Sequence, residues 1–239
     1  MTRIEVDPAP GRARVRHTPG PVAARVQRAD ERGARVALVA TTALLLGGDE
    51  VVLDVRVGPG GWLDVVEIAG TVAYDAQGAA SKWTVRAEVA AGGVLTWSGE
   101  PFVVADGANV TRSTTLHLAA DARACVRETV VFGRIGEPGG AIRACARVVA
   151  DGRDLLVEDL DLPDAQTRGF PGILGACRVI DTVLLAGARA PVTPSLKAGV
   201  RYDLAGPGTI ARVLATDAAR TGLDAVWRDW SDAARAASV

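Results

Sequence analysis

Alternation of apolar and polar residues over short stretches is the feature that most constrains the fold of this chain. Residues 51–57 read Val-Val-Leu-Asp-Val-Arg-Val, and residues 82–89 alternate charged or hydroxyl side chains with Trp, Val and Ala. A period of two residues is typical of a β-strand that buries one face. Turn signals, such as the Gly-Pro-Gly-Gly run at 58–61, interrupt the strands at intervals of about 8–12 residues. The pattern predicts a mainly β chain of sandwich, barrel or solenoid type.

The same alternation predicts most of the remaining strands. They are expected at residues 62–68, 94–97, 102–104, 113–118, 124–132, 141–149, 154–160 and 208–214. The run at 58–61 is read as a hairpin turn that returns the chain along 62–68. No fixed-period sequence repeat is visible, so a regular repeat array is not expected.

The clearest helix lies at the C-terminus. Apolar residues recur there at helical spacing, at positions 223, 226, 227 and 230,. Thr216 or Asp217 is the expected N-cap. We expect one further short helix within residues 170–185.

Nothing marks a domain boundary, so the chain is interpreted as a single domain over residues 1–239. Residues 1–20, rich in Pro, Gly and Arg, are expected to be a loose lead-in with one early strand.

Composition and charge exclude several classes of function. The net charge is −1 and the basic residues form no run, so no nucleic-acid footprint is seen,. The longest apolar run, residues 37–46, is shorter than the roughly 18 residues that a membrane span needs. The N-terminus has no signal-peptide pattern, which predicts a cytoplasmic protein without membrane attachment. Three widely spaced cysteines suggest neither a disulfide framework nor a metal site,.

Side chains that carry chemistry are sparse. The two histidines have no partner at ligand spacing, and His117 is expected on the solvent face of a strand,. Nucleophile motifs are absent, and the five tryptophans lie in apolar phase, which favours the core,. The carboxylates Glu100, Glu128 and Glu158 lie in or beside strands, which leaves a carboxylate-dependent hydrolase open. A generic all-β protein-binding module is the other reading that the residues alone allow.

A succession of short motifs goes further than periodicity. In order, they are Gly47-Gly48-Asp49-Glu50, Val57-Gly58-Pro59-Gly60, Tyr74, residues 90–97, Asp106-Gly107-Ala108, Phe132-Gly133-Arg134, Gly136-Glu137, residues 151–158, Ala211-Arg212-Val213-Leu214 and Val226-Trp227-Arg228. This order and spacing resemble the UreD (also UreH) family of urease accessory proteins over nearly the whole chain after residue 34. The chain departs from the family pattern at 72–75, 98–101 and 138–141, which marks it as a divergent member.

The resemblance implies a single elongated β-rich domain of stacked or helical sheets, sandwich-like, with a C-terminal helix and one more short helix. It implies a non-catalytic, chaperone-like scaffold that binds the urease apoprotein and the accessory protein UreF, which recruits the GTPase UreG. It also implies delivery of nickel to the urease site through an internal tunnel. No tightly bound cofactor is expected, only nickel in transit.

Four positions match family residues tied to that passage. Asp49, Glu128 and Glu158 are the expected weak metal contacts, and Thr71 is expected to line the channel. Carboxylates along a wet channel offer a hydrated divalent ion several weak oxygen contacts, and weak contacts at several sites permit transit. These residues could equally be turn caps and strand-end carboxylates, and Asp49 after two glycines suits a turn.

Overall fold

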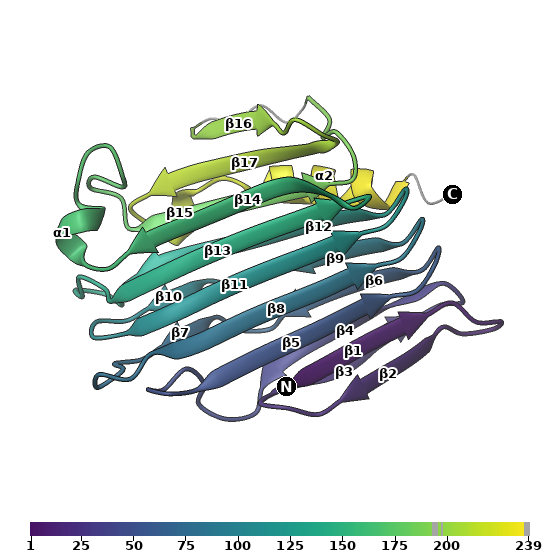
Figure 1. The fold of residues 1–239 in the computed structure, drawn as a ribbon, viewed down its shortest axis with the longest axis horizontal. Helices are drawn as coiled ribbons and strands as arrows, with labels where there is room; N and C mark the ends of the chain where they lie inside the picture. Colours follow the sequence, from purple (N-terminus) through teal and green to yellow (C-terminus); the bar gives the residue numbers. More distant parts are fainter. Residues whose placement is uncertain (193–195, 197, 237–239) are drawn as a thin grey trace.

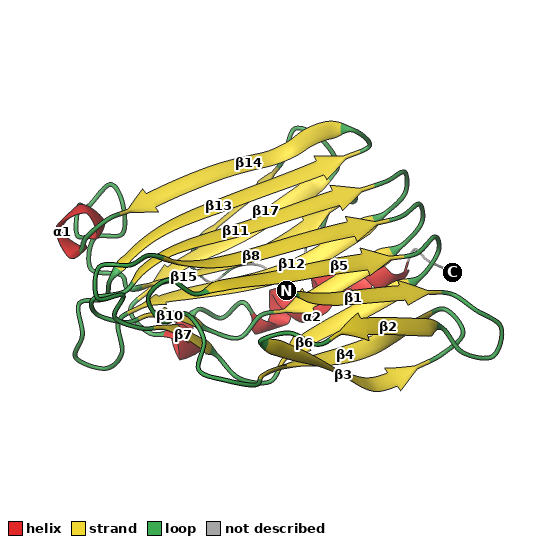
Figure 2. Cartoon of the chain, turned by 60° about the horizontal axis from the view of Figure 1, so that its bottom comes forward, coloured by secondary structure: helices red, strands yellow, loops and turns green. Residues whose placement is uncertain are grey.

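The computed structural model describes residues 1–192, 196 and 198–236. Over that part, two β-sheets lie face to face and form an elongated, mostly β molecule (Figure 1, Figure 2). Sheet A has the strand order β14 (Arg153–Leu162), β13 (Ala141–Ala150), β11 (Asn109–Leu118), β8 (Ser81–Val89), β5 (Glu50–Val57), β1 (Thr2–Asp7) and β2 (Arg14–Thr18). Sheet B has the order β16 (Val200–Asp203), β17 (Gly208–Ala215), β15 (Val179–Ala186), β12 (Arg123–Phe132), β9 (Val94–Ser98), β6 (Trp62–Glu67), β4 (Gly33–Ala40) and β3 (Val22–Ala29). The short strands β7 (Thr71–Ala73) and β10 (Phe102–Val104) pair with each other, and β10 also pairs with β12.

The central strands form a coil that passes repeatedly from one sheet to the other. Strands β5, β8, β11 and β13 pair in parallel in sheet A and begin 28 to 32 residues apart. Their successors β6, β9 and β12 pair in parallel in sheet B. The mainly β, stacked prediction is therefore confirmed, as are its two helices.

Two expectations about this region were wrong. The run at 58–61 does not close a hairpin, because β5 and β6 belong to different sheets. The repeat array that the sequence argued against is present as structure. An inward-facing position of such a coil needs only an apolar side chain of suitable size, so successive coils can stack without sharing a residue pattern.

The core lies between the sheets and follows the alternation in the sequence. Its members are mainly aliphatic, and they include Ile4, Leu53, Val55, Val65, Val85, Leu95, Leu116 and Ile142. Trp83 and Trp97 are each 4% exposed in this layer, and Trp230, on the buried face of the C-terminal helix, is 1% exposed. The core assignment of these tryptophans is confirmed, whereas Trp62 and Trp227 are only partly buried.

The C-terminal helix α2 (Asp224–Ala236) packs on the outer face of sheet B, against β9, β12 and β15. Asp217 does not cap it: its carboxylate accepts from the backbone N–H of Ala219 and caps a 3-10 turn, η1 (Ala218–Arg220). The second helix, α1 (Ala165–Arg168), begins before the segment expected for it and is capped by Asp164. Among the described residues, no helix is long and apolar enough to span a membrane.

The N-terminal segment is ordered, contrary to the expected loose lead-in with one strand. Strands β1 and β2 pair antiparallel, and β1 also pairs in parallel with β5. Ile4 and Val6 are 1% and 0% exposed, so they extend the core by one strand. Two buried aliphatic side chains and two ladders of backbone hydrogen bonds offset the entropy cost of ordering this segment.

Candidate functional site

Four charged side chains lie between the two sheets, where the strand pattern would otherwise place apolar residues. Arg112 on β11 and Glu158 on β14 come from sheet A, and Glu128 on β12 and Arg212 on β17 come from sheet B. Arg112 follows the buried Val110 by two residues, so both point to the same face of β11,. We call these four residues the inter-sheet row.

Each carboxylate of the inter-sheet row is bound by an arginine. Arg112 Nη1 lies 2.7 Å from Glu128 Oε2, and the hydroxyl of Thr114 donates to Glu128 Oε1 at 2.8 Å. Arg212 donates from both Nη atoms to Glu158, at 3.0 and 2.8 Å, in the forked geometry that favours a guanidinium,. The two predicted glutamates are thus held by charge-assisted hydrogen bonds.

A hollow of about 320 Å³ opens beside the row. The polar side chains along it include Arg112, Glu128, Glu158, Thr182 and Arg212. A smaller space of about 60 Å³ continues from it and is again lined by both glutamates. We call the two together the inter-sheet hollow. Glu128 and Glu158, which lie 30 residues apart in the chain, therefore face one common space.

The charges of the row are held in place by one another. Burial alone would lower the pKa of Arg212, but hydrogen bonds and attraction from Glu158 outweigh burial and raise that pKa,. Arg212 also donates from Nε to the hydroxyl of Thr182 at 2.9 Å. By contrast, the buried Nε of Arg112 has no hydrogen-bond partner among the described residues. The row therefore keeps one buried donor without a partner among the described residues, which suits polar groups that face a wet space,.

A second hollow, of about 230 Å³, holds the predicted residue Thr71. Glu67, Tyr74 and Trp83 line it as well, and we call it the side hollow. Both oxygens of Glu67 accept hydrogen bonds, from Trp97 Nε1 at 3.0 Å and from the backbone N–H of Glu100 at 3.0 Å.

Glu67 connects the side hollow electrostatically with the inter-sheet row. Burial raises its pKa, attraction to Arg112 acts against that rise, and repulsion from Glu128 adds to it. Glu67 was missed by the sequence reasoning. Its signal was available, because Glu67 continues the inward phase of Leu63 and Val65 on β6.

Asp49 lies outside both hollows, on the turn before β5. Its carboxylate accepts from the backbone N–H of Leu46 at 3.0 Å, and its carbonyl accepts from the N–H of Lys82 at 2.8 Å. The structure therefore groups Glu128 with Glu158, places Thr71 in the side hollow and gives Asp49 the contacts of a turn cap. A role in metal transit stays a prediction for all four residues.

Two further candidate ligands, Cys145 and Asp159, also lie along the inter-sheet hollow. Within the described ranges, no group of three His, Cys, Asp or Glu side chains is placed to hold a metal ion. His117 is exposed on β11, as expected. Cys125 is buried as expected, but Cys145 is partly exposed and its thiol donates to Asp159 at 3.4 Å.

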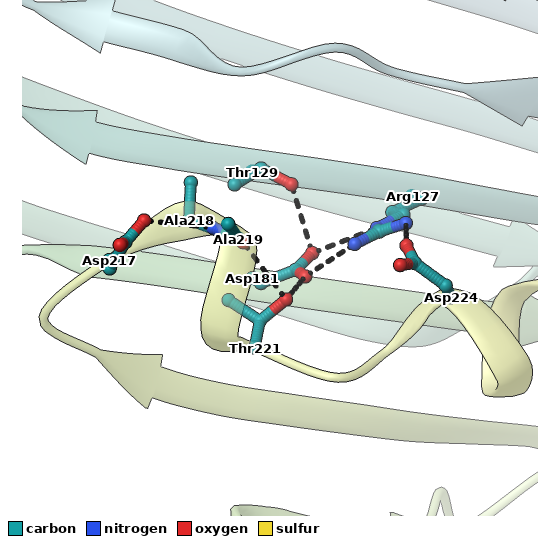
Figure 3. Close-up of polar contacts among 8 residues, drawn as sticks. All are labelled: Arg127, Thr129, Asp181, Asp217, Ala218, Ala219, Thr221 and Asp224. Atoms are coloured by element: carbon teal, nitrogen blue, oxygen red, sulfur yellow. Dashed lines mark hydrogen bonds and ion pairs between the residues drawn. The ribbon is translucent and has the colours of Figure 1, made fainter.

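A second buried network lies on the other face of sheet B, beneath the C-terminal segment (Figure 3). Asp181 on β15 is 0% exposed and accepts two hydrogen bonds from Arg127, at 3.2 and 2.8 Å. The hydroxyls of Thr129 and Thr221 also donate to it, at 2.9 and 2.5 Å. Arg127 then reaches Asp224, the first residue of α2, at 2.6 Å. We call these five residues the helix anchor, because they join β12 and β15 to the start of α2.

Comparison with known proteins agrees with this architecture. The family described as UreD urease accessory protein matches residues 2–238. Urease accessory protein UreD 1 of Streptomyces griseus subsp. griseus is 51% identical over 184 residues, which are 77% of this chain and 71% of that protein. UreD of Frankia alni is 40% identical over 195 residues, covering 72% of this chain and 65% of that protein. UreD 3 of the same Streptomyces is 33% identical over 232 residues, which are 91% of this chain and 90% of that protein. The chain therefore belongs to the UreD urease accessory protein family.

Proposed function

We propose that this chain is a non-catalytic scaffold for urease maturation in the cytoplasm. It would bind the urease apoprotein on one side and UreF on the other, with UreG joined through UreF. The observation that carries the proposal is the family match over residues 2–238, together with relatives that are named urease accessory proteins. The long open sheets offer the extended surface that a bridging protein requires,.

We further propose that nickel passes through the inter-sheet hollow. Glu128, Glu158 and Asp159 are the carboxylates that line it, beside a mainly aliphatic core. Hard oxygen donors suit a hydrated divalent ion. Each carboxylate already binds an arginine, so an arriving ion competes with a guanidinium and is held only weakly. Weak, competed contacts favour passage over storage.

The same geometry does not favour the hydrolase alternative. A glycosidase needs one carboxyl group held protonated as the acid and a second one free to act as base or nucleophile. Here both glutamates are bound by guanidinium groups at 2.7 and 2.8 Å. A scaffold with a polar passage accounts for these pairs better than a pair of catalytic carboxylates.

Assembly is tested by co-purification and by deletion. The purified chain should form a complex with the urease apoprotein and with UreF, and a strain that lacks the chain should contain urease with little nickel. Full urease activation in the deletion strain would show that the scaffold proposal is wrong.

The passage is tested with variants that keep the fold. Glu158→Gln and Glu128→Gln should lower the nickel content of urease while co-purification with the partners stays intact. Glu88→Gln is the matched control, because Glu88 is a strand carboxylate on the outer face of sheet A, 60% exposed at its side chain. Normal nickel loading with both test variants would remove the transit assignment.

A further inference from the structure

The two arginines of the inter-sheet row are held by different numbers of contacts. Arg212 uses three nitrogen atoms, because both Nη atoms donate to Glu158 and Nε donates to the hydroxyl of Thr182. Arg112 approaches Glu128 through Nη1 at 2.7 Å, and its buried Nε has no hydrogen-bond partner among the described residues. Arg112 is therefore the arginine that can leave its carboxylate with the smaller loss of hydrogen bonds.

The guanidinium of Arg112 is supported by an aromatic ring. It lies over Phe102, 5.3 Å from the ring centroid. Phe102 contacts Trp83 edge to face, with ring centroids 6.0 Å apart, and Trp83 lines the side hollow. The face of a ring attracts a cation without imposing a hydrogen-bond direction. This aromatic pair therefore connects Arg112, beside the inter-sheet hollow, with the side hollow and leaves its guanidinium free to turn.

Glu67, in the side hollow, differs from the other carboxylates that line the two hollows. Glu128, Glu158 and Asp159 each have an arginine within ion-pair distance. Glu67 has no such partner in the part of the chain that the structure describes, and it accepts from neutral donors, the indole of Trp97 and a backbone N–H. Glu67 is therefore the carboxylate that still lacks a counter-charge of its own.

Arg112 acts on Glu67 from its position beside Glu128. Burial raises the pKa of Glu67, attraction to Arg112 lowers it, and repulsion from Glu128 raises it again. One guanidinium thus lies between two carboxylates, one in each hollow, and is paired with only one of them. When a cation occupies the first carboxylate, the guanidinium can pair with the second, so that no charge is left unpaired in the core.

We propose that Arg112 is the exchangeable counter-charge of the nickel passage. The inference rests on the proposed function and adds the residue that regulates the passage. A hydrated divalent ion takes the place of Arg112 at Glu128, and the displaced guanidinium turns to Glu67. When Arg112 returns to Glu128 it expels the ion, whereas Arg212 stays bound to Glu158.

The test measures the affinity of the purified full-length chain for Ni²⁺ alone, by titration calorimetry. Arg112→Gln removes the counter-charge, Glu67→Gln removes its alternative partner, and a third variant combines the two. Arg147→Gln is the matched control, because Arg147 also pairs with a carboxylate on sheet A but lies outside both hollows. Thermal melting establishes that each variant is folded. Arg112→Lys keeps the charge and tests whether charge is what matters at this position.

Arg112→Gln should bind Ni²⁺ at least about tenfold more tightly than the wild type, because no guanidinium then competes for Glu128. Glu67→Gln should bind it about tenfold more weakly, because Arg112 then has no second carboxylate to receive it. Once Arg112→Gln is present, Glu67→Gln should change nothing, since Glu67 acts through Arg112. Arg112→Lys and Arg147→Gln should both stay near the wild-type affinity.

Three results would overturn the inference. The first is an affinity of Arg112→Gln at or below that of the wild type. The second is wild-type affinity of Glu67→Gln, a result that does not depend on the folding of Arg112→Gln. The third is an equal loss from Glu67→Gln with and without Arg112, which would make Glu67 a direct contact of the ion.

Failure of this inference is distinguishable from failure of the proposed function. If neither the wild type nor any variant binds Ni²⁺, the proposed passage fails together with the exchange. Because the titration uses the chain alone, a failure to co-purify with urease apoprotein would end the scaffold proposal without changing the measured exchange.

Discussion

The helix anchor and the inter-sheet row are built from the same parts and differ in their surroundings. Both pair arginine with carboxylate and accept a hydrogen bond from threonine, but the row joins strands of the two facing sheets, whereas the anchor joins neighbouring strands of sheet B to the start of α2. Asp181 of the anchor is 0% exposed and each of its oxygens accepts two hydrogen bonds, with none of the described hollows beside it. In the row, Glu128 and Glu158 are each bound mainly by one arginine and face a hollow of about 320 Å³.

The difference shows how access to space decides what a buried ion pair can do. A carboxylate that is enclosed and fully bonded cannot exchange partners without leaving an unpaired charge in the core. A carboxylate beside a hollow can exchange its arginine for water or a cation at a smaller cost. The anchor therefore fastens α2, whereas the row remains able to change its contacts.

The largest loss in the free energy of unfolding is expected when the helix anchor is broken. Asp181→Ala removes the main partner of Arg127. The Arg127 side chain is only 15% exposed, so water cannot fully replace that partner. Loss of one partner of a buried pair should lower the free energy of unfolding by about 3–5 kcal/mol. Urea unfolding measures it, with Asp224→Ala as a control at the exposed end of the same network, 78% exposed. A loss below about 1 kcal/mol for Asp181→Ala would show that the enclosed anchor is no more important for stability than a surface pair.

A smaller loss is expected in the inter-sheet row. Glu158→Gln removes the charge that Arg212 binds, but both side chains are 29% exposed and water can reach them. The free energy of unfolding should fall by about 1.5 kcal/mol, the low end for hydrogen bonds to charged groups. If this variant were as destabilised as Asp181→Ala, the row would be a second anchor and not an exchangeable pair.

A double substitution sharpens the same point. Arg212→Gln added to Glu158→Gln replaces the ion pair by two neutral amides beside the hollow. Because neither charge is then left alone, the double variant should recover most of the stability lost by Glu158→Gln. Urea unfolding of the two single variants and the double variant gives the coupling between the side chains. Simple addition of the two losses would show that the pair does not act as a unit.

The smallest loss of stability is expected for an ion pair on the surface, and it serves as a reference for the two larger losses. Arg134 binds Glu137 in the turn after β12, and hydrogen bonds from the Arg134 side chain and backbone lower the pKa of Glu137 to about 2. A lowered pKa means that the pair stabilises the fold at neutral pH and that this contribution is lost as pH falls from about 4.5 through about 2,.

Glu137→Gln should therefore lower the melting temperature slightly at pH 7, and the difference from wild type should vanish near pH 2. Melting curves of both proteins across this pH range measure it. A difference that persists unchanged at the acid end would mean that the turn depends on the shape of Glu137 and not on its charge.

The comparison also explains which parts of the structure were predictable. Strands such as β5 and β8 were found because alternation is local and strong. The coil was missed because the glycine-rich turn at 58–61 serves a hairpin and a passage between sheets equally well. Glu128 and Glu158 were singled out through the family resemblance. The partners Arg112 and Arg212 were not foreseen, because contacts across two sheets depend on register, which turn signals do not encode.

The coil that carries the row has a consequence for how the chain reaches its fold. Each central strand of sheet A pairs with the strand that begins 28 to 32 residues away, so coil length sets the reach of these contacts. Such a stack can grow coil by coil from the N-terminus while the ribosome still holds the rest of the chain. Strand β15 then joins antiparallel to β12, β17 joins antiparallel to β15, and helix α2 follows them in the sequence. The inter-sheet hollow therefore acquires Arg212 only after the strands of sheet A have been synthesised.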